Sequence, residues 1–398
     1  MSDKDEIAEP ACSSRQLSAE TVFSEMSTIQ DSPESRKRKV SKVKDRIGRY
    51  VPGQWAHTKS TDNNLIPCLN ACLDWLPAEG VDSLVHDVES CGDDEALYYV
   101  FKTLASGLLQ PMKALSTGAS VTESPIIKHQ RNADLVAANI PEPQSRTDEF
   151  RDKCLRRDGS RCVVTQRMDI NLWKNINRPS EVDHGDVEAA HIIPFAYASW
   201  HNISACPIPH PPLETPHPPN IYLSRQNANL VQGEKNAANV WETLFRCFPS
   251  IRRIGMNARN INDASNGITL LDIIHKQFGK FRCAFEPTET PHVYNFKTYL
   301  DYPYKKVFFP QDQKVTMRKA EGGEDVKLPS PELLECHWRI AEILNASGMS
   351  EIIDRIIKDW EYIKEGDEGH GSLREDGKSN VSEILSAAFW AHGHWVKT

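Results

Sequence analysis

Two short segments carry the residues best suited to hydrolytic chemistry. Glu188 to Pro194 (EAAHIIP) places His191 among small and aliphatic residues, and Ser265 to Phe278 (SNGITLLDIIHKQF) holds Asn266 and His275. A neutral imidazole with a pKa near neutral pH can accept a proton from water, and an imidazole is also a common ligand of divalent transition metals. The two histidines therefore offer a base and a metal ligand, the groups that metal-assisted hydrolysis needs.

The local pattern predicts the elements that position these groups. The apolar neighbours of His191 are typical of a buried strand, residues 268–271 predict a short second strand, and residues 272–278 predict a helix that carries His275. Asn266 and Gly267 stand just before the second strand. Asn-Gly is also the commonest two-residue hairpin turn, because both residues tolerate positive φ, so a plain turn is the alternative for Asn266.

The order of His191, Asn266 and His275 along strand, turn, strand and helix resembles the HNH nuclease family, whose ββα-metal unit cuts phosphodiester bonds. The IIP after His191 fits the family pattern, and the resemblance covers about residues 150–285, including CVVT at Cys162. It implies an α+β fold with a central ββα-metal nuclease-like domain between helical flanks. It also implies that His191 is the general base, that Asn266 steadies the loop bearing the base, and that His275 binds the metal.

The chain departs from the family pattern at the metal ligands. Ala190 stands where many members have Asp or His, Gly279 stands about one turn after His275, and Thr165 stands where a zinc-bracing Cys occurs in some members. Glu188 shares a strand face with position 190 and is one substitute ligand; Asp272, one turn before His275, is another. Mg²⁺ is the expected ion, since it keeps much of its water shell and needs few protein ligands; Mn²⁺ and Zn²⁺ are the alternatives.

Asp183 and His184 offer a competing alignment. The same Asp-His dipeptide occurs at the base position of many family members. Here, however, Gly185 and Asp186 follow it, which predicts a polar loop rather than a strand. Moving the alignment there would leave His191 unexplained in an apolar strand, so we assign the base to His191. A single site further requires that the side chains of His191 and His275 converge.

Two functions fit these residues. The first is a metal-dependent endonuclease that hydrolyses phosphodiester bonds in nucleic acid, and the second is a nucleic-acid-binding or regulatory protein that keeps the HNH scaffold with little or no turnover. A third class, an interaction protein that works through C-terminal helices bearing Trp338 and Trp360, is disfavoured because tryptophans at helical spacing usually pack into a core.

Charge distribution is compatible with a nucleic-acid partner. The whole chain carries a net charge of −8, but residues 146–285 contain 18 Lys and Arg against 14 Asp and Glu. Local charge matters most to a phosphate backbone, because salt screens interactions beyond about 10 Å. DNA is the expected substrate, with RNA as the alternative.

Composition also predicts the organisation of the chain. Residues 1–48 predict a disordered tail, 49–115 a small helical domain, 116–145 a linker, 146–300 the nuclease-like domain, 301–365 a helical region, and 366–398 a loose tail with a terminal helix.

The chain has no membrane-spanning stretch and no secretory signal, and its ten cysteines are scattered, so an intracellular location with reduced thiols is expected. The basic run Arg36 to Lys39 predicts a nuclear address, with a plain solvated charge cluster as the alternative.

Overall fold

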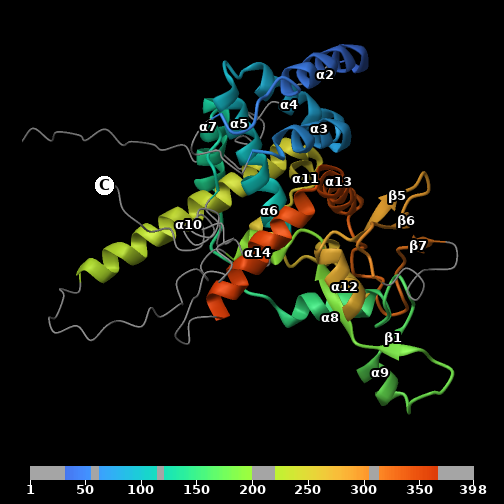
Figure 1. Cartoon of the computed structure of the whole chain (residues 1–398). Helices are drawn as coiled ribbons and strands as arrows, with labels where there is room; N and C mark the ends of the chain where they lie inside the picture. Colours follow the sequence, from blue (N-terminus) through green and yellow to red (C-terminus); the bar gives the residue numbers. More distant parts are fainter. Residues whose placement is uncertain (1–31, 55–61, 114–120, 200–219, 304–312, 366–398) are drawn as a thin grey trace, which may run out of the picture.

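Helices make up the N-terminal part of the protein in the computed structural model, which describes residues 32–54, 62–113, 121–199, 220–303 and 313–365 (Figure 1). They are α2 (Pro33–Ile47), α3 (Leu65–Trp75), α4 (Ala78–Glu89), α5 (Asp94–Leu104), the π-helical turn η1 (Ala105–Leu109) and α6 (Gln110–Lys113). Apolar residues recur at three and four positions and give each long helix a buried face, such as Leu65, Leu69 and Cys72 of α3. Residues 65–75, 78–89 and 94–113 are therefore helical, within the range predicted as a small helical domain.

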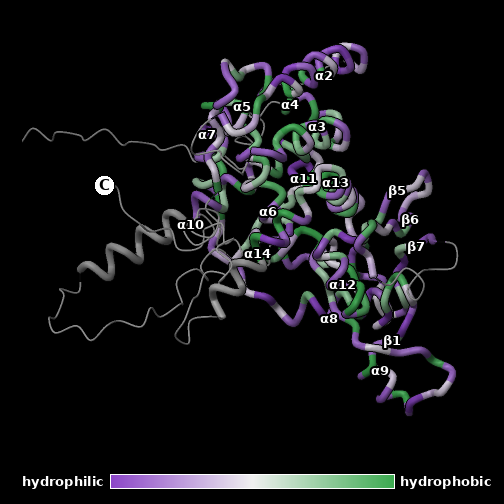
Figure 2. Tube along the Cα trace, viewed as in Figure 1, coloured by the Kyte–Doolittle hydropathy of each residue, from purple (hydrophilic) through white to green (hydrophobic). Residues whose placement is uncertain are grey.

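Helix α2 lies within the predicted disordered tail, so that prediction is wrong for Pro33–Ile47; residues 1–31 lie outside the described residues. Val43 and Ile47 are buried in the core. Basic side chains of α2 pair with acidic side chains of the next helices, as Arg36–Asp82 (2.5 Å), Lys44–Asp74 (2.5 Å) and Arg46–Asp94 (2.6 Å). Figure 2 shows α2 as largely hydrophilic and α3 as largely hydrophobic. The composition of this segment predicted disorder wrongly, because the basic side chains of α2 form ion pairs with acidic side chains of helices later in the chain.

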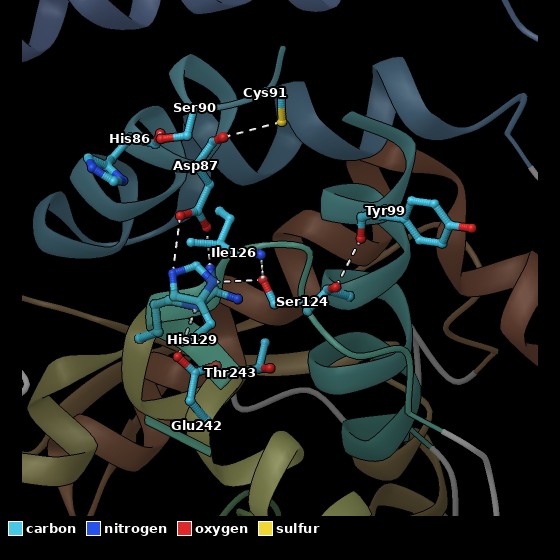
Figure 3. Close-up of polar contacts among 12 residues, drawn as sticks. His86, Asp87, Ser90, Cys91, Tyr99, Ser124, Ile126, His129, Glu242 and Thr243 are labelled. Atoms are coloured by element: carbon cyan, nitrogen blue, oxygen red, sulfur yellow. Dashed lines mark hydrogen bonds and ion pairs between the residues drawn. The ribbon is translucent and has the colours of Figure 1, made fainter. Parts of the chain in front are cut away.

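The predicted linker 116–145 is likewise wrong for α7 (Ile127–Ala137), which packs against the long helix α10 (Asn220–Cys247). A buried polar cluster joins α4, α7 and α10 (Figure 3). Asp87 accepts a 2.6 Å hydrogen bond from Arg246 Nη1 and lies 3.2 Å from His129 Nε2, while Ser124 Oγ and His129 Nδ1 are 2.9 Å apart. Ser124, His129 and Asp87 are 7%, 5% and 2% exposed. Their order matches that of a hydrolase triad, but their burial leaves no room for a substrate, so the cluster is structural.

Two antiparallel strands, β3 (Val187–His191) and β4 (Gly267–Leu271), pair in a register that sets His191 opposite Gly267. Helix α12 (Asp272–Gly279) follows β4 directly, as the sequence predicts. The strand pair contacts α12 and also α8 (Asp148–Arg157). All five residues of β4 are buried because helices cover the strand pair.

The chain between β3 and β4 includes η2 (Phe195–Ala198), α10, α11 (Pro249–Arg253), η4 (Ala258–Asn260) and η5 (Ala264–Asn266). Before β3, the short parallel strands β1 (Met168–Asp169) and β2 (His184–Gly185) flank α9 (Ile170–Asn175), which lies at the lower edge of Figure 1. The CVVT segment that begins at Cys162 forms a turn, because Gln166 at φ 59° folds the chain back and its backbone N donates to Cys162 O.

After α12, the strands β5 (Cys283–Pro287), β6 (Val293–Thr298) and β7 (Lys314–Thr316) form an antiparallel sheet. Helices α13 (Pro331–Ser347) and α14 (Met349–Glu365) follow and are separated by Gly348 at φ 70°, the left-handed conformation that glycine accepts most readily. Trp338 of α13 packs edge-on against Trp75 of α3, as expected for a core tryptophan. The helix predicted near the C-terminus and the side chain of Trp360 lie outside the described residues.

One hydrophobic core runs from Val43 of α2 through Leu69, Trp241 and Phe285 to Ile353 of α14. The predicted boundaries at residues 115 and 145 are therefore not marked by separate cores. Within the described residues, none of the helices is long and apolar enough to span a bilayer.

We predict that Asp87→Ala lowers the free energy of unfolding by about 3–5 kcal/mol, the usual cost of removing one partner of a buried ion pair. The variant leaves the buried Arg246 without its nearest carboxylate. Asp325→Ala, which removes the exposed partner of Arg156, is the control and should change this free energy little. Urea unfolding followed by circular dichroism measures both variants, and equal losses would contradict a special role for the buried cluster.

Candidate active site

His191 closes strand β3, and its ring lies in an aromatic setting. The ring stacks on Phe150 of α8 with centroids 3.8 Å apart and planes at 12°. Phe195 of η2 lies on another side, at 5.6 Å between ring centroids. His191 Nε2 is 3.1 Å from Asn262 Oδ1. Packing and one hydrogen bond together fix the orientation of the imidazole.

The hydrogen bonds of Asn262 assign the protonation of that ring. Asn262 Nδ2 donates to Ser145 O at 2.9 Å, so its Oδ1 is the atom that faces His191. An amide oxygen only accepts, which means that His191 Nε2 carries the hydrogen and Nδ1 keeps the lone pair. Nδ1 is thus the basic atom of the site.

Burial lowers the pKa of His191 to about 4, because desolvation disfavours the charged imidazolium. The hydrogen bond to Asn262 acts in the opposite direction, while the positive charge of Arg146 lowers this pKa further. His191 is therefore neutral, with Nδ1 able to accept a proton, at physiological pH.

Asn266 is fully buried, and its amide joins two loop segments. Oδ1 accepts from Ile193 N at 2.8 Å, while Nδ2 donates to Ile193 O at 3.1 Å and to Ile261 O at 2.9 Å. The alternative of an Asn-Gly hairpin turn is wrong, because Asn266 ends the 3₁₀ turn η5 and Gly267 is extended, at φ −132° and ψ 149°. Asn266 thus holds the chain that leaves β3 just after His191.

Gly267 is required by close packing rather than by a special φ. A Cβ at this position would lie 2.5 Å from Cys154 Sγ and 2.7 Å from Phe150 Cε2. The absent side chain lets α8 approach β4, and the same Phe150 then stacks on His191. Helix α8 is thereby positioned against both strands.

His275 and Glu188 meet at the surface, where His275 Nδ1 is 2.5 Å from Glu188 Oε2 and the two side chains are 35% and 52% exposed. His337 of α13 supports α12 from behind, because it stacks on Phe278 and its Nε2 lies 3.1 Å from Phe278 O. Asp272 does not join the pair; its carboxylate accepts from Lys276 Nζ at 3.3 Å.

A metal ion at this place would have few protein ligands. Within the described residues, no cluster combines three or more His, Cys, Asp or Glu side chains suited to a metal. One carboxylate and one imidazole suit a water-rich Mg²⁺ or Mn²⁺ site. They do not suit a structural Zn²⁺ site, which takes four protein ligands.

The two histidines do not touch each other. Strand alternation turns Glu188 toward His275 on α12, whereas Ala189 packs against the cluster of Phe150 and Cys154, on the side where His191 stacks. Within the described residues, no hydrogen bond or ring contact joins His191 to His275, so the expected convergence does not appear as a direct contact.

Asp183 and His184 lie apart from this arrangement, in the excursion that contains β1, α9 and β2. The His184 ring stacks on Trp173 at 3.7 Å between centroids, and Asp183 is 3.8 Å from Arg167. These partners account for both residues without a catalytic role.

Sequence reasoning missed three residues around His191. Phe150 and Asn262 contact its ring, and Arg146 lies close enough for its charge to lower the pKa of His191. Phe150 lies in the first turn of α8, but nothing in its local sequence indicates a contact with His191. Asn262 and Arg146 stand in loops, where polar residues are ordinary, so their meeting depends on the tertiary fold.

We predict that Gly267→Ala lowers the free energy of unfolding by about 1–3 kcal/mol, because the added methyl overpacks the contact between α8 and β4. Gly279→Ala is the matched control, since a Cβ there meets nothing within 4 Å. This control should be neutral or slightly stabilising, as is usual for Gly to Ala in a helix. Thermal or urea unfolding compares them, and a Gly267→Ala variant as stable as wild type would refute the packing argument.

Comparison with known proteins relates the region that contains these residues to one protein family. Residues 162–286 match the model of the family described as HNH endonuclease. No curated protein and no solved structure gives a significant match. The matched region contains Glu188, His191, Asn266 and His275, whereas Arg146 and Phe150 precede it. Residues 162–286 of this chain therefore form a domain of the HNH endonuclease family.

Proposed function

We propose that this protein is a metal-dependent endonuclease that hydrolyses phosphodiester bonds in nucleic acid, with DNA as the expected substrate. One observation supports the proposal most strongly. His191, inside the matched region, is neutral; its Nε2–H donates a hydrogen bond to Asn262 Oδ1, and its Nδ1 keeps the lone pair that can act as a base. The charge excess of residues 146–285 is compatible with a phosphate backbone.

In the proposed reaction, Nδ1 of His191 takes a proton from a water molecule, and the resulting hydroxide attacks the phosphorus. The P–O bond to the leaving sugar oxygen breaks, and this oxygen takes a proton from solvent water, while the imidazolium of His191 returns its proton to solvent. Asn262 holds the ring in the required tautomer, and Asn266 fixes the loop that follows the base. A bound divalent cation would offset the negative charge that develops on the phosphate. Glu188 and His275 are the residues that would hold it, and β3, β4 and α12 would form the ββα-metal unit.

Mg²⁺ is the proposed ion, with Mn²⁺ as the first alternative. The single carboxylate and imidazole leave most ligand positions to water and substrate, which Mg²⁺ accepts. Zn²⁺ fits this donor set less well, because its protein sites usually supply at least three side chains. Asp272 is set aside as a ligand because it pairs with Lys276.

We predict that the purified protein nicks supercoiled plasmid in Mg²⁺ or Mn²⁺ and that EDTA abolishes the nicking. His191→Ala should lower the rate by about 10²- to 10⁴-fold, the usual contribution of a general base. His184→Ala is the matched control and should cleave like wild type, because its exposed histidine stacks on Trp173 outside the site. Gel assays measure these rates, and cleavage that survives His191→Ala would remove the catalytic assignment.

A scaffold function without turnover is the second candidate. Ala190 replaces a frequent family ligand, and the described residues supply two metal-binding side chains rather than three. DNA binding without cleavage in any divalent metal would favour this candidate over the endonuclease.

The pKa of His191 gives a separate prediction: by NMR its ring should titrate near pH 4 instead of near 6.5. Because the folded pKa is lowered, the unfolded chain binds more protons between these values, and this histidine's contribution to stability is lost as pH falls from about 6.5 toward 4. The imidazole signal that is missing from the spectrum of His191→Gln is assigned to His191. A midpoint near 6.5 would show that the ring is hydrated and would contradict the desolvated environment assigned to His191.

A nuclear location remains a proposal based on the basic run. On α2, Lys37 and Arg38 are exposed, whereas Arg36 pairs with the buried Asp82.

A further inference from the structure

Arg146 lies in the loop before α8, and neighbouring hydrogen bonds fix the path of this loop. Gln144 N donates to Ala198 O at 2.7 Å, which ties the loop to η2. Ser145 O accepts from Asn262 Nδ2 at 2.9 Å, and the same amide contacts His191. One asparagine therefore links the backbone beside Arg146 to the proposed base.

The Arg146 side chain is held near His191 by an aromatic ring. Its guanidinium carbon lies 5.4 Å from the centroid of Phe195, and the Phe195 ring is 5.6 Å from that of His191. A cation over an aromatic face is attracted by the ring quadrupole, and it can still use its N–H groups for other contacts. The charge is close enough to His191 to lower the pKa of this histidine.

Arg146 differs from nearby arginines in its lack of a counter-charge. Arg156 pairs with Asp325 and Arg157 with Asp158, both at 2.8 Å. Within the described ranges, by contrast, no carboxylate forms an ion pair with Arg146, and this residue is exposed. The side chain is thus positioned but not neutralised.

We propose that Arg146 binds the non-bridging oxygens of the scissile phosphate, the group attacked by the water that His191 activates. This inference rests on the proposed function, which supplies nucleic acid as the substrate. A guanidinium matches phosphate through two parallel N–H···O bonds and keeps its charge at every working pH. Arg146 would hold the phosphate next to the base from a position outside the matched family region, and so would share with the cation the task of offsetting its charge.

DNA binding without metal tests this contact separately from cleavage. A fluorescein-labelled duplex of about 30 base pairs is titrated with the full-length protein in EDTA, from about 50 to about 200 mM KCl. We expect Arg146→Gln to weaken binding and to reduce the slope of log K against log salt by about 0.9, the value for one lost phosphate contact. Arg131→Gln, which removes an exposed arginine of α7, should keep the wild-type slope.

The binding results decide the proposal in either direction. An unchanged slope for Arg146→Gln, an equal change for Arg131→Gln, or absence of DNA binding by the wild type would each overturn it. Circular dichroism of both variants establishes that they fold.

Cleavage rates add a second test of the same contact. Arg146→Gln should lower kcat/KM by about 10²-fold, the usual effect of losing a donor to a developing oxyanion. Arg146→Lys keeps the positive charge but lacks the two parallel N–H donors of the guanidinium. This variant should retain the wild-type slope of log K against log salt and should cleave faster than Arg146→Gln. Wild-type cleavage that Arg146→Gln leaves intact overturns the role of Arg146. Absence of wild-type cleavage counts against the proposed endonuclease, and the binding slope then still decides whether Arg146 contacts phosphate.

Discussion

The buried amide of Asn266 is the constraint on which the site depends. Its oxygen and nitrogen both bond to the backbone of Ile193, 73 residues earlier in the chain, and its nitrogen also bonds to Ile261. A buried amide left unpaired costs about 1–3 kcal/mol, so this arrangement strongly favours one position of the chain after β3. That position sets His191 across from Gly267 and lets Asn262, in the same turn as Ile261, reach the imidazole.

Helix α8 completes the surroundings of the base through a second close approach. Gly267 admits Phe150 and Cys154, Phe150 covers the His191 ring, and the loop before α8 brings Arg146 alongside. Glu188 of β3 and His275 of α12 pair with each other at the surface. The site thus combines a half-buried neutral base with an exposed pair of potential metal ligands, and strand β3, which carries His191 and Glu188, belongs to the matched family region.

The sequence predicted the parts of this arrangement that depend on local pattern. Strand β3 and the succession of β4 and α12 follow from the spacing of apolar residues along the chain. It failed where distant partners decide the outcome. Helix α2 gains order from acidic residues of α3, α4 and α5, and Asn262 and Arg146 reach His191 only after the chain between β3 and β4 has folded. The turn after Cys162 depends on the positive φ of Gln166, a conformation that the residue type does not predict.

Rescue of His191→Ala by free imidazole tests the central claim, that His191 supplies the base, most directly. Removal of the ring leaves a space bordered by Phe150 and Phe195, into which imidazole can enter. The account predicts that added imidazole restores plasmid cleavage by His191→Ala in a saturable manner and does not restore cleavage by His275→Ala. A folded, DNA-binding His191→Ala variant whose cleavage rate does not respond to imidazole would contradict it.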